Sequence, residues 1–137
     1  MSADKKFLFS MFFLRVSVFL VILMWTIDKF VNPSHASKIY EKFYAVSGIG
    51  ASVVNVVGVV ELMVLVLFLV GVKKTYTYGA VLALHSASTL SAFGQYFTPF
   101  EGSHLLFFAA WPMMAACVML FLFRKEDTLF QLSPKLA

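Results

Sequence analysis

The chain has 137 residues, of which 61% are apolar and only 13% are charged. A soluble domain usually carries about 25% charged residues, so this composition excludes an ordinary water-soluble protein. The apolar residues form long runs, and a run of about 18 or more with few charges is long enough to cross a bilayer as one helix. We therefore expect an all-α integral membrane protein.

The first apolar run covers residues 7–27 and contains Arg15. A cleaved signal peptide is the alternative interpretation, with Lys5 and Lys6 as its charged region and "SHA" (34–36) as its cleavage site. The apolar region of a signal peptide spans roughly 7 to 15 residues, which is shorter than this run, and an internal arginine does not suit one. We therefore expect the segment to stay in the protein as the first transmembrane helix.

The connection that follows, "DKFVNPSHASKIYEKFYAVSG" (28–48), is the one sizeable loop in the sequence. Within it Ile39, Phe43 and Val46 recur at spacings of four and three, with charged residues between them. This pattern predicts a short amphipathic helix that lies on the membrane surface. Asn32 and Pro33 are expected to turn the chain into this helix.

The second run covers residues 50–72 and includes the stretch "GVVELMVLVLFLVG" (58–71), in which the one charged residue is Glu61. A charged side chain at the bilayer centre costs ~2.5 to 3.5 kcal/mol on insertion scales, and it normally faces the protein interior and pairs with another group. Gly58 lies about one turn before Glu61, where the absence of a side chain lets a neighbouring helix approach. We expect Glu61 to point into the protein.

The third run, residues 77–97, is the least apolar, because its part "HSASTLSAFGQ" (85–95) is polar for a helix in lipid. Polar groups in lipid need internal partners, so this face is expected to turn into the bundle. The fourth run, residues 105–123, carries the single cysteine, Cys117, which excludes a disulfide or a thiol redox pair within the chain. The prediction is one membrane domain, residues 1–137, built as a four-helix bundle.

The basic residues in the short flanks of these runs predict the orientation. With a cytoplasmic N-terminus, seven lysines and arginines lie inside and three lie outside. The positive-inside rule then places both termini in the cytoplasm. The net charge of +4 is accounted for by these flanks and implies no nucleic-acid partner. The inner residues are Lys5, Lys6, Lys73, Lys74, Arg124, Lys125 and Lys135, and the outer ones are Lys29, Lys38 and Lys42.

Three ionisable residues are expected at a similar depth in the membrane. At ~1.5 Å per residue from the inner ends of their runs, Arg15, Glu61 and His85 lie roughly 12 to 17 Å above the cytoplasmic boundary. We expect them to form one intramembrane polar cluster in which Glu61 pairs with Arg15. Three interpretations stay open: a pair that only fixes helix docking, a proton- or quinone-related role, and exposure to a water-filled cavity.

Two polar stripes are expected to line a narrow cleft that opens to the outside. One stripe lies on the first helix, and the other follows His85 at spacings of three and four on the third helix. The alternative is that the hydroxyl groups only bond backbone carbonyls at a close helix contact. The residues expected to line the cleft are Thr26, Lys29, Ser88, Gln95 and Tyr96.

Several of these residues, in this order, resemble the DoxX/DoxD group of four-helix bacterial membrane proteins: Arg15, "DKF" (28–30), a loop with a short helix, Gly58 with Glu61, and "LVG" (69–71). The resemblance covers roughly the first 75 residues, and the glycine often found in the first helix is absent. It implies a small subunit of an envelope redox enzyme in the bacterial inner membrane, the named example being a quinone-linked thiosulfate oxidation complex. The family pattern falls on Arg15, Lys29, Gly58 and Glu61.

The sequence contains no phosphate-binding glycine loop and no nucleophile elbow. His85 in mid-membrane and His104 at the outer end of the fourth helix cannot ligate one haem, which needs an imidazole on each side of the iron. His35, Glu101 and His104 lack the spacing of a metal site. We therefore expect no metal and no covalently bound cofactor.

The function that we expect is a non-catalytic or quinone-binding subunit that docks a membrane or envelope redox protein. Two other functions stay open. One is a small transporter or proton-coupled carrier that uses Glu61 and His85 and works as a homo-oligomer, since four helices leave little room for a path in a monomer. The other is a structural assembly factor.

Overall fold

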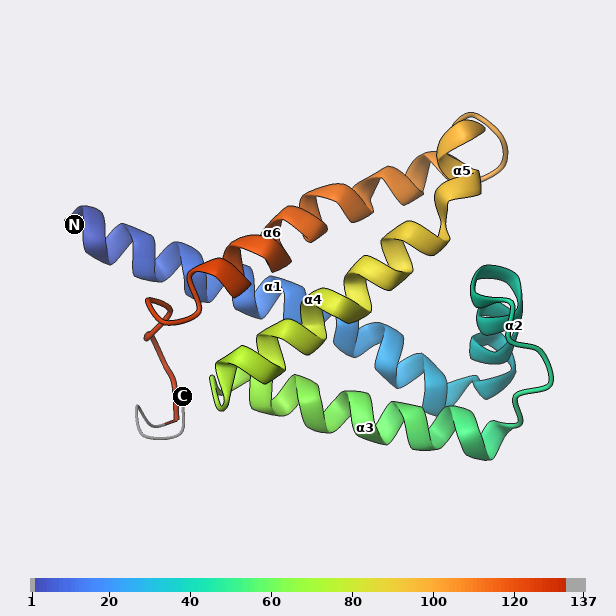
Figure 1. The fold of residues 1–137 in the computed structure, drawn as a ribbon, viewed down its shortest axis with the longest axis horizontal. Helices are drawn as coiled ribbons and strands as arrows, with labels where there is room; N and C mark the ends of the chain where they lie inside the picture. The colour runs from blue at the N-terminus through green and yellow to red at the C-terminus, as the bar shows by residue number, and fades with distance from the viewer. Residues whose placement is uncertain (1, 133–137) are drawn as a thin grey trace.

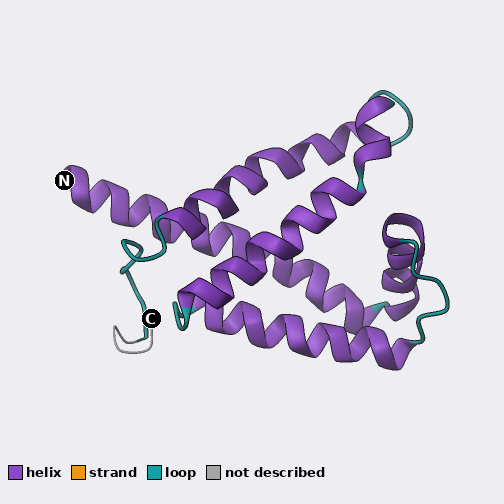
Figure 2. Cartoon of the chain, viewed as in Figure 1, coloured by secondary structure: helices purple, strands orange, loops and turns teal. Residues whose placement is uncertain are grey.

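The computed structural model describes residues 2–132, and within this range the chain is helical, with no strand (Figure 2). Two of the helices, α5 and the 3-10 helix η1, are short and lie next to each other in the sequence. The elements follow the order α1 (Ala3–Val31), α2 (Pro33–Tyr44), α3 (Ala51–Leu69), α4 (Lys74–Ser91), α5 (Phe93–Phe97), η1 (His104–Ala109) and α6 (Ala110–Leu122).

Three helical stretches in the described part of the chain are long and apolar enough to cross a membrane. They are α1, α3 and the continuous stretch His104–Leu122 formed by η1 and α6. The prediction of an all-α membrane protein is confirmed. The third predicted crossing is occupied by α4 and α5, which are separated at Ala92, and α4 is too polar to be counted with the other three. Its hydroxyl-bearing residues and His85 lower its hydropathy.

The helices are arranged as two antiparallel pairs. α1 packs mainly on α3, α4 packs mainly on α6, and contacts between α3 and α4 join the pairs. Figure 1 shows the N-terminus, the turn between α3 and α4, and the chain after α6 at one end of the molecule, with α2 and α5 at the opposite end. We call these the inner and the outer end.

The corner between α1 and α2 is shaped by Asn32. Its backbone N–H donates to the carbonyl of Asp28 and ends α1, while its side chain accepts from the N–H of His35 and caps α2. Pro33 is the first residue of α2, where its fixed φ and missing N–H fit the start of a helix. The predicted loop helix is therefore present. It begins at Pro33, before the apolar pattern that predicted it, and it ends at Tyr44, so that Val46 lies outside it.

The core lies where α1, α3, α4 and α6 meet. Its most buried residues are Met11, Val18, Leu65, Phe68, Tyr78, Val81, Cys117 and Leu120. Large apolar side chains also cover the outside, including Phe13 at 72% exposure and Val56 at 63%. A soluble monomer rarely exposes so much contiguous apolar surface, so this surface is suited to contact with lipid.

Candidate functional site

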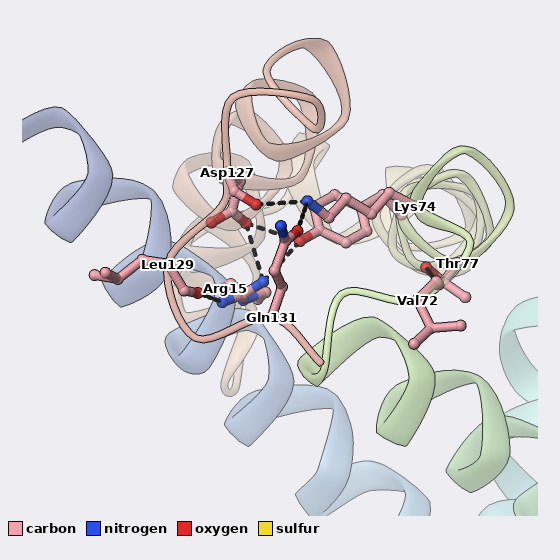
Figure 3. Close-up of polar contacts among 8 residues, drawn as sticks. Arg15, Val72, Lys74, Thr77, Asp127, Leu129 and Gln131 are labelled. Carbon is pink, nitrogen blue, oxygen red and sulfur yellow. Dashed lines mark hydrogen bonds and ion pairs between the residues drawn. The ribbon is translucent and has the colours of Figure 1, made fainter. Parts of the chain in front are cut away.

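Arg15 is fully buried at the inner end, and it does not pair with Glu61. Its Nη1 lies 3.5 Å from Oδ2 of Asp127 and donates to the hydroxyl of Tyr78 at 3.2 Å. Its Nη2 donates to the backbone carbonyl of Leu129. Figure 3 shows Arg15 close to Asp127 and Leu129, with dashed lines marking its contacts. The predicted Arg15–Glu61 pair is therefore wrong.

The reason is the register of α1 on α3. Glu61 lies level with Thr26, which follows Arg15 by eleven residues, or ~16 Å along the helix axis. Arg15 instead lies level with Gly71, because a Cβ built on Gly71 would be 3.2 Å from Nη1 of Arg15. The depths estimated from the sequence assumed that the first run begins, and the second run ends, at the same inner surface of the membrane. In the structure α1 extends past the turn between α3 and α4.

Asp127 belongs to a non-helical segment, residues 123–132, that we call the inner strap. Its carboxylate is fully buried and accepts from the hydroxyl of Tyr78 at 2.7 Å. Lys74 donates to the backbone carbonyl of Asp127 and to Oε1 of Gln131, both at 2.6 Å. The inner cluster therefore consists of Arg15, Lys74, Tyr78, Asp127 and Gln131.

Sequence reasoning missed Asp127 because the inner strap has no helical periodicity from which its position could be read. One signal was available: a buried arginine needs an acidic partner, and Asp127 follows the inner end of the last apolar run by only a few residues. Two buried atoms of this ion pair, Nε of Arg15 and Oδ1 of Asp127, have no hydrogen-bond partner among the described residues.

Glu61 lies in a second cluster, toward the outer end, where α1, α2 and α3 meet. Its Oε2 is 2.9 Å from Nζ of Lys29 and accepts from the hydroxyl of Thr26 at 3.1 Å. The Lys29 and Glu61 side chains are 12% and 13% exposed, whereas Thr26 is fully buried. With Tyr40 of α2, these residues form what we call the outer cluster.

Tyr40 responds to the charge of Glu61. Burial raises the pKa of Tyr40 to about 12, and the negative charges of Glu61 and Tyr44 add to this effect. Because its pKa is higher in the folded chain than the usual value of 10.0, the stability that the neutral hydroxyl contributes is complete below pH 10 and is lost as the pH rises toward 12. At neutral pH the hydroxyl is therefore a hydrogen-bond donor.

Replacing Tyr40 by phenylalanine should remove one step, near pH 12, from the alkaline titration of the tyrosines. We expect the ultraviolet titration of the wild-type chain to show a late phenolate signal near pH 12 that the Tyr40→Phe variant lacks. The Glu61→Gln variant should keep this step but move it to lower pH. A step near pH 12 that is unchanged in Tyr40→Phe would contradict the assignment.

Gly58 lies one turn from Glu61 and contacts Phe30 of α1. A Cβ on Gly58 would be 2.8 Å from Cζ of Phe30. Because the Phe30 ring is 40% exposed and can turn away, Gly58→Ala should cost less than about 1 kcal/mol. Gly58→Leu should cost about 1 to 3 kcal/mol, because it must separate α1 from α3. Unfolding of both variants in detergent checks this order, and equal losses would contradict it.

His85 lies at the contact between α4 and α6, away from both clusters. Its Nε2 is 2.9 Å from the carbonyl oxygen of Ala110 and 3.2 Å from the hydroxyl of Thr89. The predicted single cluster of Arg15, Glu61 and His85 is therefore not assembled. Each of the three residues has its own partners on different elements.

The two predicted polar stripes also have different neighbours. Thr26 and Lys29 face Glu61, whereas Tyr96 donates to the carbonyl of Thr89 and packs on Trp111. The break at Ala92 places Tyr96 in α5, so its helical spacing from His85 does not continue. Ser88 is exposed and Gln95 is half-buried. No contact found among the described residues joins the stripes into one cleft.

Comparison with known proteins identified no matching family model, no similar curated protein and no similar solved structure. Between residues 2 and 132, no group of three or more His, Cys, Asp or Glu residues is placed to hold a metal ion. The fold and the two clusters define a small helical membrane protein in which one charge pair joins two helices and another joins a helix to the inner strap.

Proposed function

We propose that the chain is a four-helix protein of the bacterial inner membrane, related to the DoxX/DoxD group, and that it serves as a non-catalytic subunit of an envelope oxidoreductase. In this proposal the outer cluster holds the headgroup of a quinone, and both termini lie in the cytoplasm. The partner is a redox protein of the membrane or the envelope.

A crossing by α4 is supported by the way its polar groups are satisfied. Thr89 donates to the carbonyl of His85, Ser86 donates to the sulfur of Met114, and His85 contacts Ala110. The partners of these polar groups lie in α4 itself or in α6, so the groups need no water to be hydrogen-bonded. Polar composition alone is therefore no obstacle to a fourth crossing.

The orientation is supported by the basic residues gathered at the inner end. Lys5, Lys6, Lys73, Arg124 and Lys125 belong to the N-terminus, the turn between α3 and α4, and the strap. Lys74 is buried in the inner cluster, and Lys135 lies outside the described residues. The bias toward the inner end therefore remains without these two residues.

Thiol labelling tests this orientation. Cysteines introduced at Lys38 and Ser103, which are exposed near the outer end, should react with an impermeant reagent added to sealed cells. A cysteine at the exposed Lys125 should react only after the cells are opened. The reverse pattern would overturn the orientation. Labelling at Lys38 and Lys125 but not at Ser103 in sealed cells would show that α4 does not cross, because α6 would then carry Lys125 to the outside.

The main observation in support of the proposed function is that three residues of the DoxX/DoxD pattern lie next to one another in the structure. Lys29, Gly58 and Glu61 come from the resemblance to the DoxX/DoxD group, and they meet at the contact between α1 and α3, with Phe30 of the "DKF" sequence against Gly58. Arg15, the fourth residue of the pattern, lies in the inner cluster instead.

The chemistry of the outer cluster suits a quinone headgroup. Quinone carbonyl oxygens accept hydrogen bonds, and the Lys29 ammonium and the Tyr40 hydroxyl are donors. Glu61 holds the ammonium in place at 2.9 Å and leaves it other protons to donate. A carrier that uses Glu61 together with His85 lacks comparable support, because these residues contact different helices.

Purification in mild detergent tests the proposal. A redox enzyme should co-purify with the chain, and organic extraction of the complex should yield a quinone. The Lys29→Met variant should retain the enzyme but lose the quinone, and Lys42→Met, which changes an exposed lysine of α2, should retain both. A homo-oligomer that carries neither enzyme nor quinone would contradict the proposal and favour a carrier.

A further inference from the structure

Phe123, where the inner strap begins, packs edge-on against Phe7 of α1, but the rest of the strap is attached to the helices mainly by polar contacts. Beyond those of the inner cluster, the backbone N–H of Leu132 donates to the carbonyl of Val70 at 2.9 Å. The side chains of Phe130 and Leu132 are 69% and 68% exposed, and the closest aromatic contact of the strap's end is that of Phe130 with Phe12 at 4.9 Å between ring centroids. Little apolar surface therefore holds the end of the strap in place.

One residue of the strap is held in an unfavourable backbone conformation. Phe130 has a φ of +52°, in the left-handed region that bulky residues rarely adopt. Its neighbours on both sides make bonds that impose this conformation: Leu129 accepts from Arg15, and Gln131 accepts from Lys74. Release of these bonds would relieve the strain at Phe130.

The groups beneath the strap are predominantly cationic. Counted at their ordinary charges, Arg15 and Lys74 carry two positive charges and Asp127 carries one negative charge, which leaves the buried inner cluster at +1 among the described residues. Nε of Arg15 is also without an acceptor there. Uncompensated charge is costly in a buried site, so an anion that can carry more negative charge than the Asp127 carboxylate would be bound favourably in its place.

We propose that the inner strap opens, and that Arg15, Lys74 and Tyr78 then form a binding site for a phosphate group, in which the phosphate takes the place of the Asp127 carboxylate. The guanidinium and the ammonium match a phosphate in charge, and a phosphate offers more acceptor oxygens than the carboxylate does. The phosphate comes from an anionic lipid at the inner surface or from solution. This site is separate from the outer cluster and does not depend on the proposed function.

A distance measurement across the strap tests the proposal. Spin labels on cysteines at Tyr76 and Thr128, both exposed, report the separation of the strap from α4 in a chain whose Cys117 is replaced by alanine. In phosphatidylcholine vesicles we expect one short distance. Vesicles that contain phosphatidylglycerol, or addition of inorganic phosphate, should shift the distribution to longer distances. The first condition tests the lipid as the source, and the second tests the free anion.

Matched variants separate release of the strap from general effects. Asp127→Asn should populate the longer distance without any anion, whereas Glu126→Gln, which changes the exposed neighbouring acid, should not. If Asp127→Asn does not fold, Gln131→Ala weakens the strap without touching the ion pair and should raise the response to phosphate. Sodium chloride at matched ionic strength should leave the short distance unchanged.

Two results would overturn the proposal. One is a single unchanged distance in the folded Asp127→Asn or Gln131→Ala variant, with and without phosphate, which would show a permanently fixed strap. The other is a strap that opens in these variants but responds to neither anion source more than to chloride, which would show that no phosphate site lies beneath it.

Discussion

Replacing Asp127 by asparagine, or Arg15 by methionine, is expected to lower the free energy of unfolding by about 3 to 5 kcal/mol. The two side chains are fully buried and 3.5 Å apart, so each replacement leaves the other charge without its partner. The double variant should lose less than the sum of the two, with a coupling of about 0.5 to 3 kcal/mol. Denaturant titration of the purified chain in detergent micelles measures all four proteins.

Two comparisons make this result specific. Arg15→Met and Glu61→Gln should be additive, because these residues have separate partners. Glu126→Gln should change stability little, because Glu126 is exposed. If Arg15 couples to Glu61 and not to Asp127, the register of α1 on α3 in the structure is wrong and the pairing expected from depth alone is right.

Replacing Lys29 by methionine is expected to raise the KM of the associated oxidoreductase for quinone by about tenfold to a hundredfold, with little change in kcat. In the proposed function Lys29 gives the headgroup a charge-assisted hydrogen bond, worth about 1.5 to 3 kcal/mol. The loss is expected on KM because, in this proposal, the subunit binds the quinone and does not carry out the chemistry. Turnover of the purified complex over a range of quinone concentrations, normalised to assembled subunit, measures the effect.

Replacing Lys29 or Glu61 should change the free energy of unfolding far less than it changes the activity of the complex. Lys29 and Glu61 are 12% and 13% exposed, whereas Arg15 and Asp127 are fully buried, so the charge left unpaired in the outer cluster is less completely enclosed by protein. Glu61→Gln should give abundant folded protein with a smaller rise in KM, because the amide still accepts from Thr26. An unchanged KM in Lys29→Met would remove the quinone from the proposal, and a change in kcat alone would point to a catalytic role.

The sequence by itself determined the class of the protein and the existence of most elements. Long apolar runs are sufficient to predict helices in a membrane, because lipid offers the backbone no other hydrogen-bond partners. The spacing of Ile39 and Phe43 was likewise sufficient to predict α2. The helix begins earlier than this spacing indicates because proline favours the first helical position. The resemblance also selected Lys29 and Glu61, whose contact the structure reveals.

Only the tertiary structure decided which charges meet. Periodicity predicts the face of a helix on which a residue lies, but it does not predict the position of one helix along the axis of another. Glu61 lies level with a residue of α1 eleven positions after Arg15, so the two charges have different partners. Asp127 could not be placed at all, because the strap is not helical and its path is set by the bonds that it makes with Arg15, Lys74 and Tyr78. Local hydrogen bonds form each helix and so decide which residues share a face, and the sequence is enough to predict this. The register of one helix on another and the path of the strap depend on contacts between residues far apart in the chain.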